Sequence, residues 1–177
     1  MRKLLVVGVF LVIPLSALAQ QTPEVEVFGG YSNLAANLGT SSFDMNGVNF
    51  SAAENLNSWF GGALDFTSHF GTENGFRVDT QSLTYGPVFS YRKLKRVVPF
   101  SHALVGAVRG GPDYLGISKP IVHFDTCVGG GVDVKIRPNL ALRLFQADYV
   151  MTRFSKTRQD NMRLSAGIVL LLGKKKK

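Results

Sequence analysis

Three classes of protein are excluded by what the sequence lacks. Cys127 is the only cysteine, so no disulfide can form within the chain. Beyond the first 15 residues, no apolar run approaches the roughly 20 residues of a membrane-spanning helix. The net charge of +8 falls to +2 once Arg2, Lys3 and the lysines at 174–177 are set aside. The fold itself is therefore not expected to carry a basic surface for nucleic acid.

The N-terminus has the pattern of an export signal. Two basic residues precede an apolar run at 4–15, and Ala17 to Ala19 supply the small residues of a cleavage site. The pattern predicts a signal peptide at 1–19, because the apolar run is too short for a spanning helix. The remainder is expected to be one domain at 20–173, followed by a lysine tail at 174–177.

Alternation of apolar and polar residues dominates the chain after the signal. Apolar residues recur with period two far more often than at helical spacing, which indicates an all-β protein. Eight strands are predicted, most of them as long as the 9 to 11 or so residues that a tilted strand needs to cross a bilayer. The expected fold is an eight-stranded antiparallel up-and-down transmembrane β-barrel. The predicted strands are 24–34, 44–53, 58–70, 80–91, 97–109, 122–136, 140–154 and 161–172.

The connections between these strands alternate in length. The longer ones are 35–43, 71–79, 110–121 and 155–160. The tight ones are 54–57, 92–96 and 137–139. Long loops at one end and short turns at the other are typical of outer-membrane barrels, in which the turns face the periplasm. We expect the longer loops to carry whatever surface specificity the protein has.

The two faces of the predicted strand at 122–136 differ sharply. One face carries Val122, Phe124, Val128, Val132, Val134 and Ile136. The other carries His123, Asp125, Asp133 and Lys135. In a soluble lipocalin-like barrel the apolar face would line a ligand pocket, whereas in a membrane barrel it faces lipid. Charges opposite an apolar stripe of bilayer-spanning length favour the membrane barrel, and the lipocalin-like barrel is the alternative.

Two places interrupt the alternation. In the predicted strand at 140–154, Arg143, Gln146 and Asp148 can all point inward only if a β-bulge near Leu144 or Phe145 changes the parity. Pro87 lacks the amide hydrogen that a central strand position donates, so a local irregularity is expected there as well.

Charged side chains on the predicted inner face imply a filled interior. Eight strands leave no room for a wide channel, and buried charges need partners. We therefore expect a salt-bridge network that plugs the barrel, with a gated narrow pore as the alternative. The expected members of this network are Glu26, Asp65, His123, Asp125, Asp133, Lys135, Arg143 and Arg163.

No residue set in the sequence indicates catalysis, a metal site or a cofactor. His69, His102 and His123 are the only histidines, and a zinc site needs several converging ligands. Ser68-His69 and Ser101-His102 are adjacent pairs, so on a strand each pair points to opposite faces and cannot couple a nucleophile to its base. A barrel hydrolase of the lipid A deacylase kind is therefore the less favoured alternative.

Six segments resemble the OmpA-like outer-membrane β-barrel family. They are 26–32 (EVFGGYS), 85–92 (YGPVFSYR), 98–104 (VPFSHAL), 129–135 (GGGVDVK), 142–149 (LRLFQADY) and 163–169 (RLSAGIV). Together they extend over essentially the whole chain after the signal. One departure is the end of the last predicted strand, where Leu172 and Gly173 stand in place of the aromatic residue that usually closes the family's assembly signal.

The resemblance implies a location and a set of partners. It implies a monomeric, non-enzymatic barrel in the outer membrane of a Gram-negative-type bacterium, without the family's periplasmic peptidoglycan-binding domain. Its expected partners are outer-membrane lipid and, during biogenesis, periplasmic chaperones and the barrel-assembly machinery. The expected role is structural or a surface interaction through the loops, and no motif names the loop partner.

Overall fold

Eight antiparallel strands and no helix make up the described part of the chain. The computed structural model describes residues 22–37, 42–73, 76–112, 121–154 and 157–174. The predicted signal peptide lies outside these ranges, as does all of the lysine tail except Lys174. The strands are β1 Val25–Asn37, β2 Ser42–Asn55, β3 Phe60–Glu73, β4 Phe76–Ser90, β5 Val97–Pro112, β6 Ile121–Arg137, β7 Leu140–Phe154 and β8 Thr157–Leu172.

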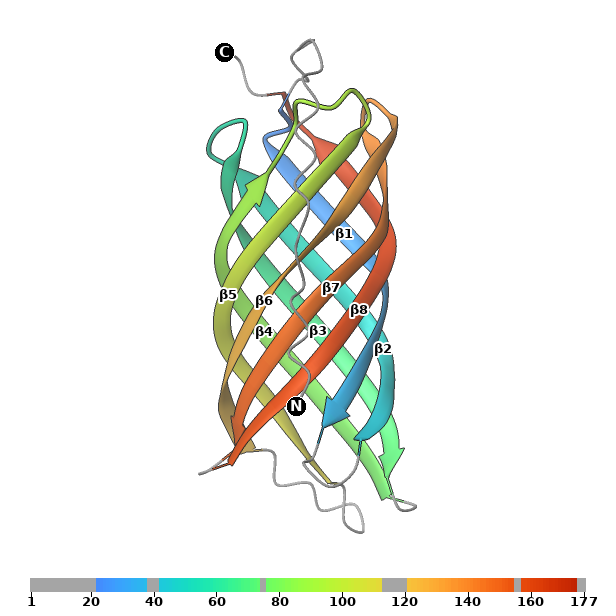
Figure 1. Cartoon of the computed structure of the whole chain (residues 1–177), viewed down its shortest axis with the longest axis vertical. Coiled ribbons are helices and arrows are strands. Elements are labelled where there is room, and N and C mark those ends of the chain that lie inside the picture. Colours follow the sequence, from blue (N-terminus) through green and yellow to red (C-terminus); the bar gives the residue numbers. More distant parts are fainter. Residues whose placement is uncertain (1–21, 38–41, 74–75, 113–120, 155–156, 175–177) are drawn as a thin grey trace, which may run out of the picture.

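The strands close into a barrel in sequence order (Figure 1). Each strand pairs with its neighbours in the chain, and β1 pairs with β8 from Val25↔Leu172 to Ala35↔Met162. No strand edge is left open in this arrangement, which removes the main route to edge-to-edge aggregation. The predicted up-and-down barrel is confirmed.

The period-two pattern determines which side chains enter the barrel. On β3, Leu64 and Phe66 are 46% and 39% exposed, whereas Asp65 and Thr67 are each 3% exposed. Successive side chains on a strand point to opposite faces, so this strand turns its apolar residues outward and its polar residues inward. The arrangement is the reverse of a soluble barrel.

We call the end of the barrel with the predicted longer loops the loop end, and the opposite end, with both chain termini of the barrel, the turn end. The strands extend further at the loop end than the sequence predicted. On β3 and β4, for example, the ladder continues from Gly71↔Val78 to Glu73↔Phe76, inside the predicted loop at 71–79. The connections at the loop end are 38–41, 74–75, 113–120 and 155–156, and those at the turn end are 56–59, 91–96 and 138–139. The predicted alternation of long and short connections is therefore wrong. The apolar alternation that marks a strand in the sequence stops short of the strand ends, but backbone hydrogen bonds continue a ladder whatever its side chains are.

A β-bulge in β7 lies where the sequence placed it. Asp133 pairs with Arg143 and Val132 with Phe145, so Leu144 is the extra residue of β7. Leu144 and Phe145 are both exposed, and the register with β8 shifts between Arg143 and Gln146. Arg143, Gln146 and Asp148 all point inward as a result, which confirms the predicted change of parity.

Pro87 leaves a gap in one ladder only. The pairing of β4 with β5 skips Gly86 and Pro87 and resumes at Val88↔His102 in the same register as Tyr85↔Val105. On its other side, Pro87 remains opposite Gly62 of β3. A missing amide donor explains the gap, and the expected irregularity is therefore local.

Candidate functional site

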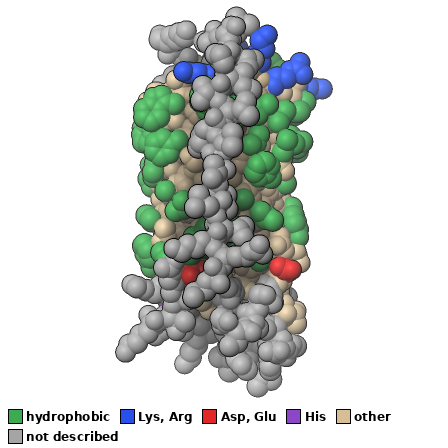
Figure 2. Space-filling view, in the orientation of Figure 1, with side chains coloured by type: hydrophobic (Ala, Val, Ile, Leu, Met, Phe, Trp, Pro, Cys, Tyr) green, Lys and Arg blue, Asp and Glu red, His purple; other side chains and the backbone are tan. Residues whose placement is uncertain are grey.

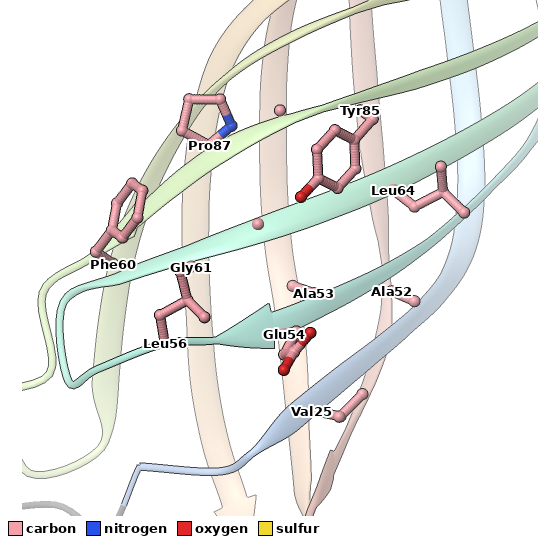
Figure 3. A pocket seen from close by; sticks show the side chains of 12 residues that line it. Val25, Ala52, Ala53, Glu54, Leu56, Phe60, Gly61, Leu64, Tyr85 and Pro87 are labelled. Carbon is pink, nitrogen blue, oxygen red and sulfur yellow. The ribbon is translucent and has the colours of Figure 1, made fainter.

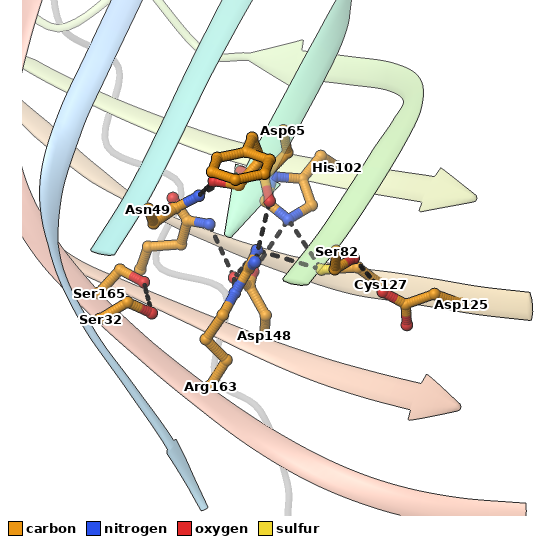
Figure 4. Close-up of polar contacts among 12 residues, drawn as sticks. Ser32, Asn49, Asp65, Ser82, His102, Asp125, Cys127, Asp148, Arg163 and Ser165 are labelled. Atoms are coloured by element: carbon orange, nitrogen blue, oxygen red, sulfur yellow. Dashed lines mark hydrogen bonds and ion pairs between the residues drawn. The ribbon is translucent and has the colours of Figure 1, made fainter. Parts of the chain in front are cut away.

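Arg163 of β8 is the centre of the polar interior (Figure 4). Its side chain is buried, and its Nη1 donates a 2.9 Å hydrogen bond to Oδ1 of Asp65. Its Nε and Nη2 lie 2.8 and 2.7 Å from Oδ2 of Asp148. One guanidinium group therefore joins β3 to β7 across the interior, in the planar geometry that suits paired carboxylates.

Asp148 makes two further polar contacts and lies close to a glycine. Its Oδ2 accepts a 2.7 Å hydrogen bond from Nε2 of Gln146, and its Oδ1 lies 2.9 Å from Nε2 of His102. Opposite Asp148 in the register is Gly129 of β6, where a Cβ atom would lie 2.1 Å from Asp148 Oδ1. The glycine therefore provides the space that the carboxylate occupies.

A second arginine lies nearer the turn end. Arg143 donates to both oxygens of Asp133, at 2.8 and 3.0 Å, and its Nη1 donates to Oε1 of Gln146 at 2.6 Å. The guanidinium carbon lies 4.3 Å from the ring centroid of Phe28 and 4.1 Å from that of Phe100. Two aromatic faces thus hold this cation, and Gln146 links it to the Arg163 cluster.

The turn end of the barrel has its own ion pair. Arg92, in the connection between β4 and β5, places Nη2 2.5 Å from Oε1 of Glu26 and 2.9 Å from Oδ1 of Asn55. Its Nη1 donates to the carbonyl oxygen of Ser58 at 2.9 Å. Arg92 could not be assigned to the interior from the sequence, because a residue in a connection has no strand parity to place it.

Smaller polar contacts occupy much of the remaining interior. Nδ2 of Asn49 donates to Oδ2 of Asp65 at 2.7 Å. Oγ of Ser32 lies 2.9 Å from Nε2 of His69 and accepts a 2.9 Å hydrogen bond from Ser165. These contacts connect β1, β2, β3 and β8 and satisfy polar groups that are cut off from water.

The eight residues predicted to enter the interior are all partly or fully buried. Those that are buried are Asp65, Asp125, Asp133, Arg143 and Arg163. Those that are half-buried are Glu26, His123 and Lys135. The structure brings together Asp65 with Arg163 and Asp133 with Arg143, and it places Asp125 beside Ser82 Oγ, which donates to it.

Three potential metal ligands also meet in the interior, a grouping that the sequence did not indicate. His102, Cys127 and Asp148 each offer one ligand atom, and these atoms all lie within 4.8 Å of one another. All three side chains are buried. The sequence does not reveal this set, because its members come from three different strands and each is the only residue of its kind in a short stretch.

The outer surface of the strands is apolar on every side of the barrel. Exposed side chains, one from each strand in order, are Tyr31, Phe50, Leu64, Tyr85, Val105, Phe124, Leu144 and Leu164. Figure 2 shows this belt on one face, with basic side chains gathered at the turn end. The exposed cations there are Lys93, Lys95, Arg96, Arg137 and Lys174. The described residues include no helix that is long and apolar enough to cross a membrane.

Aromatic rings border the belt near the turn end. Trp59 stacks on Phe89 with ring centroids 6.1 Å apart, and Phe60 lies 5.4 Å from Phe89. Nearby, Leu56, Gly62 and Tyr85 line a groove of about 420 Å³ in the outer wall (Figure 3). Small residues hollow the wall there, and the Tyr85 hydroxyl lies over Gly62. Aromatic side chains at this height are typical of an interfacial girdle.

The sequence matches no protein-family model and no curated protein. Solved structures do match. Neisserial surface protein A has a TM-score of 0.71 at 19% identity, over 84% of this chain and 97% of its own. Ail, the attachment invasion locus protein of Yersinia pestis, has 0.59 at 22% identity, over 84% and 99%. OprG of Pseudomonas aeruginosa has 0.60 at 7% identity, over 88% and 98%. The fold is therefore that of the small eight-stranded outer-membrane barrels, as the resemblance to OmpA-like proteins implied.

Proposed function

We propose that this protein is a non-enzymatic, integral barrel of a Gram-negative-type outer membrane with a structural or surface-interaction role. The observation that carries the proposal is the inversion of polarity around the whole barrel. Apolar side chains of all eight strands face outward, while ion-paired aspartates and arginines face inward. Exposing this apolar outer surface to water would be energetically unfavourable. In a bilayer the same surface would contact apolar hydrocarbon.

The interior supports a plugged barrel over a ligand-binding one. Ion pairs occupy the middle, and the cavity bordered by Phe28, His102 and Arg143 measures only about 20 Å³, roughly the space of one water molecule. A lipocalin-like pocket needs an apolar interior of several hundred Å³. We propose that the side chains seal the lumen against steady ion flow.

The ends of the barrel support an orientation. Thr22, Gly173 and the basic connections lie at the turn end, which we assign to the periplasmic side, where cations contact anionic lipid headgroups. The opposite end carries strands that run beyond the length needed to span a bilayer, since β5 and β6 have 16 and 17 residues. We propose that this end is exposed at the cell surface and carries the interaction role. Chaperones and the barrel-assembly machinery are the proposed partners during biogenesis.

Cell fractionation tests the membrane location. Expressed in a Gram-negative host with its N-terminal segment intact, the protein should remain in the outer-membrane fraction after salt and carbonate washes. It should be released by detergent and migrate differently on a gel before and after boiling. A periplasmic barrel of similar size, followed in the same fractions, serves as the control. Recovery of the folded protein in the soluble periplasmic fraction without detergent would contradict the proposal.

A further inference from the structure

We propose that His102, Cys127 and Asp148 form a binding site for a borderline-soft divalent cation, of which Zn²⁺ is the best fit, inside the barrel. The donor set is one imidazole nitrogen, one thiolate sulfur and one carboxylate oxygen. Zinc takes these three donors in tetrahedral sites, and with three protein ligands it keeps a fourth position for water. The proposal concerns the barrel interior and goes beyond the membrane role.

The distances between the donor atoms are close to those of a zinc site. Nε2 of His102 lies 3.8 Å from Sγ of Cys127 and 2.9 Å from Oδ1 of Asp148. Typical Zn–S, Zn–N and Zn–O lengths in a tetrahedron place sulfur and nitrogen about 3.6 Å apart and nitrogen and oxygen about 3.4 Å apart. The nitrogen and oxygen atoms would have to separate by about 0.5 Å to reach the tetrahedral distance. The third pair, Sγ of Cys127 and the carboxylate of Asp148, lies within 4.8 Å.

The backbone fixes the three ligands on adjacent strands. His102 of β5 is opposite Gly129 of β6, and Gly129 is opposite Asp148 of β7. Cys127 lies two residues from Gly129 on the same face of β6. Because a side chain at Gly129 would collide with Asp148 Oδ1, the glycine provides the space in which the ligands converge.

Neighbouring residues already orient the ligands as an outer shell does around a metal. Arg163 and Gln146 hold Oδ2 of Asp148, so that Oδ1 is left facing His102. Nη2 of Arg163 also donates to Sγ of Cys127 at 3.4 Å, which fixes the position of the sulfur. Hydrogen bonds of this kind fix ligand orientation and raise metal affinity in known sites.

The charge of the interior favours a cation. Apart from the Arg92–Glu26 pair at the turn end, and leaving histidines aside, the buried charged residues of the described strands are four aspartates and two arginines. They are Asp65, Asp125, Asp133, Asp148, Arg143 and Arg163. One oxygen of Asp125, on the same face of β6 as Cys127, has no hydrogen-bond partner among the described residues. A divalent ion that displaces the thiol proton to solvent brings one net positive charge into this acidic environment.

Space for a fourth ligand lies next to His102. The cavity of about 20 Å³ is bordered by His102, Asp65 and Gln146, and its lining continues to Glu26 and Ser90 towards the turn end. It has room for about one water molecule. A water in this cavity would lie beside His102, whereas Cys127 and Asp148 do not border it.

Cobalt spectroscopy on the purified barrel tests the site directly. The protein, kept reduced in detergent micelles, is titrated with Co²⁺, which replaces Zn²⁺ in tetrahedral sites and gives thiolate-to-metal charge-transfer absorption. We expect this band in the native protein and in His123→Gln, which changes a half-buried histidine outside the set. We expect the band to be lost in Cys127→Ser. In the native protein, added Zn²⁺ should displace Co²⁺ and remove the band. In His102→Gln, Co²⁺ should bind about tenfold more weakly or worse.

Thermal unfolding gives a second readout in the same samples. Zn²⁺ should raise the Tm of the native protein and of His123→Gln but not that of Cys127→Ser, because a ligand stabilises only the state that binds it. Heat-modifiable migration on a gel confirms that each variant has folded. Absence of the thiolate band in the native protein would overturn the proposal. An equal Zn²⁺-dependent rise in Tm in Cys127→Ser would also overturn it. Neither result bears on the membrane location, since both are measured after extraction.

Discussion

At the scale of single residues, Arg163 has the most concentrated set of interactions in the interior. It contacts Asp65, Asp148 and Cys127, which come from three other strands. A buried ion pair contributes little net stability over an apolar replacement, but removal of one partner leaves charges without compensation. The stability of the barrel is therefore expected to depend on this one side chain more than on any exposed cation.

Replacing Arg163 by methionine tests that expectation. Arg163→Met keeps an apolar stem of similar length and leaves the buried carboxylates of Asp65 and Asp148 without their arginine. We therefore expect a loss of about 3 to 5 kcal/mol in the free energy of unfolding. Urea unfolding in detergent, followed by the fluorescence of the single tryptophan, Trp59, measures the loss. The matched control is Arg109→Met, an exposed arginine of β5, with an expected change within about 0.5 kcal/mol. Equal losses in the two variants would contradict the expectation.

Some interior residues can be assigned to the barrel interior from the sequence, and others cannot. Arg143 and Arg163 were assigned to the interior because apolar neighbours of opposite parity surround them. His102 was not, because the inner face of β5 also carries Val98, Phe100 and Leu104, so polarity does not mark that face. Arg92 has no strand parity at all. The partner of each charged side chain depends on which strands become neighbours in the barrel. The local sequence does not specify the distances between side chains on different strands.

At the scale of elements, β7 depends on its bulge. One extra residue at Leu144 lets Ala141 and Arg143 point inward on one side of it and Gln146 and Asp148 on the other. Without the bulge, strict alternation through Leu144 and Phe145 would place the second pair on the lipid side. The bulge was predictable because the sequence shows two apolar residues in succession, Leu144 and Phe145, between inward-directed polar ones. The outer ends of the strands were not predictable, since polar residues there fit either a loop or a ladder.

Deletion of Leu144 tests the role of the bulge. Removing it leaves Phe145 as the one outward residue between Arg143 and Gln146, so that Gln146 and Asp148 still point inward and both ladders become regular. We expect this variant to refold in detergent as a heat-modifiable barrel. Deletion of both Leu144 and Phe145 reverses the parity of Gln146 and Asp148 and should give no heat-modifiable species. Deletion of Lys95, an exposed residue of the 91–96 connection, is the control and should fold. A folded barrel with native far-UV circular dichroism after the double deletion would show that the inward direction of Gln146 and Asp148 is dispensable.

At the scale of the whole molecule, the barrel is an inside-out arrangement of polarity. Closure of β1 on β8 pairs both edges, so the backbone polar groups of the wall are satisfied without water. The interior is filled by ion pairs and by a cluster that includes Leu34, Met45 and Leu104. Closure stabilises the wall, and the proposed seal of the lumen can be measured.

Conductance across a planar bilayer tests the seal. The native protein should give no steady channels, because ion pairs and apolar side chains occupy the lumen. Replacement of both Arg143 and Arg163 by alanine removes the two cations that hold the middle together, and we expect frequent leak events. Arg109→Ala, on the outer surface, should behave like the native barrel. Large steady channels in the native protein would refute the plug.

The sequence by itself determined the strand number, the face that each alternating strand turns outward and the bulge in β7. These are properties of local periodicity, and a strand expresses period two wherever it lies. Only the tertiary structure decided which inner side chains meet, because closure of the barrel places residues as distant as Asp65 and Arg163 at hydrogen-bond distance. The convergence of His102, Cys127 and Asp148 has the same origin. Each is unremarkable on its own strand, and the register across β5, β6 and β7 makes them one site.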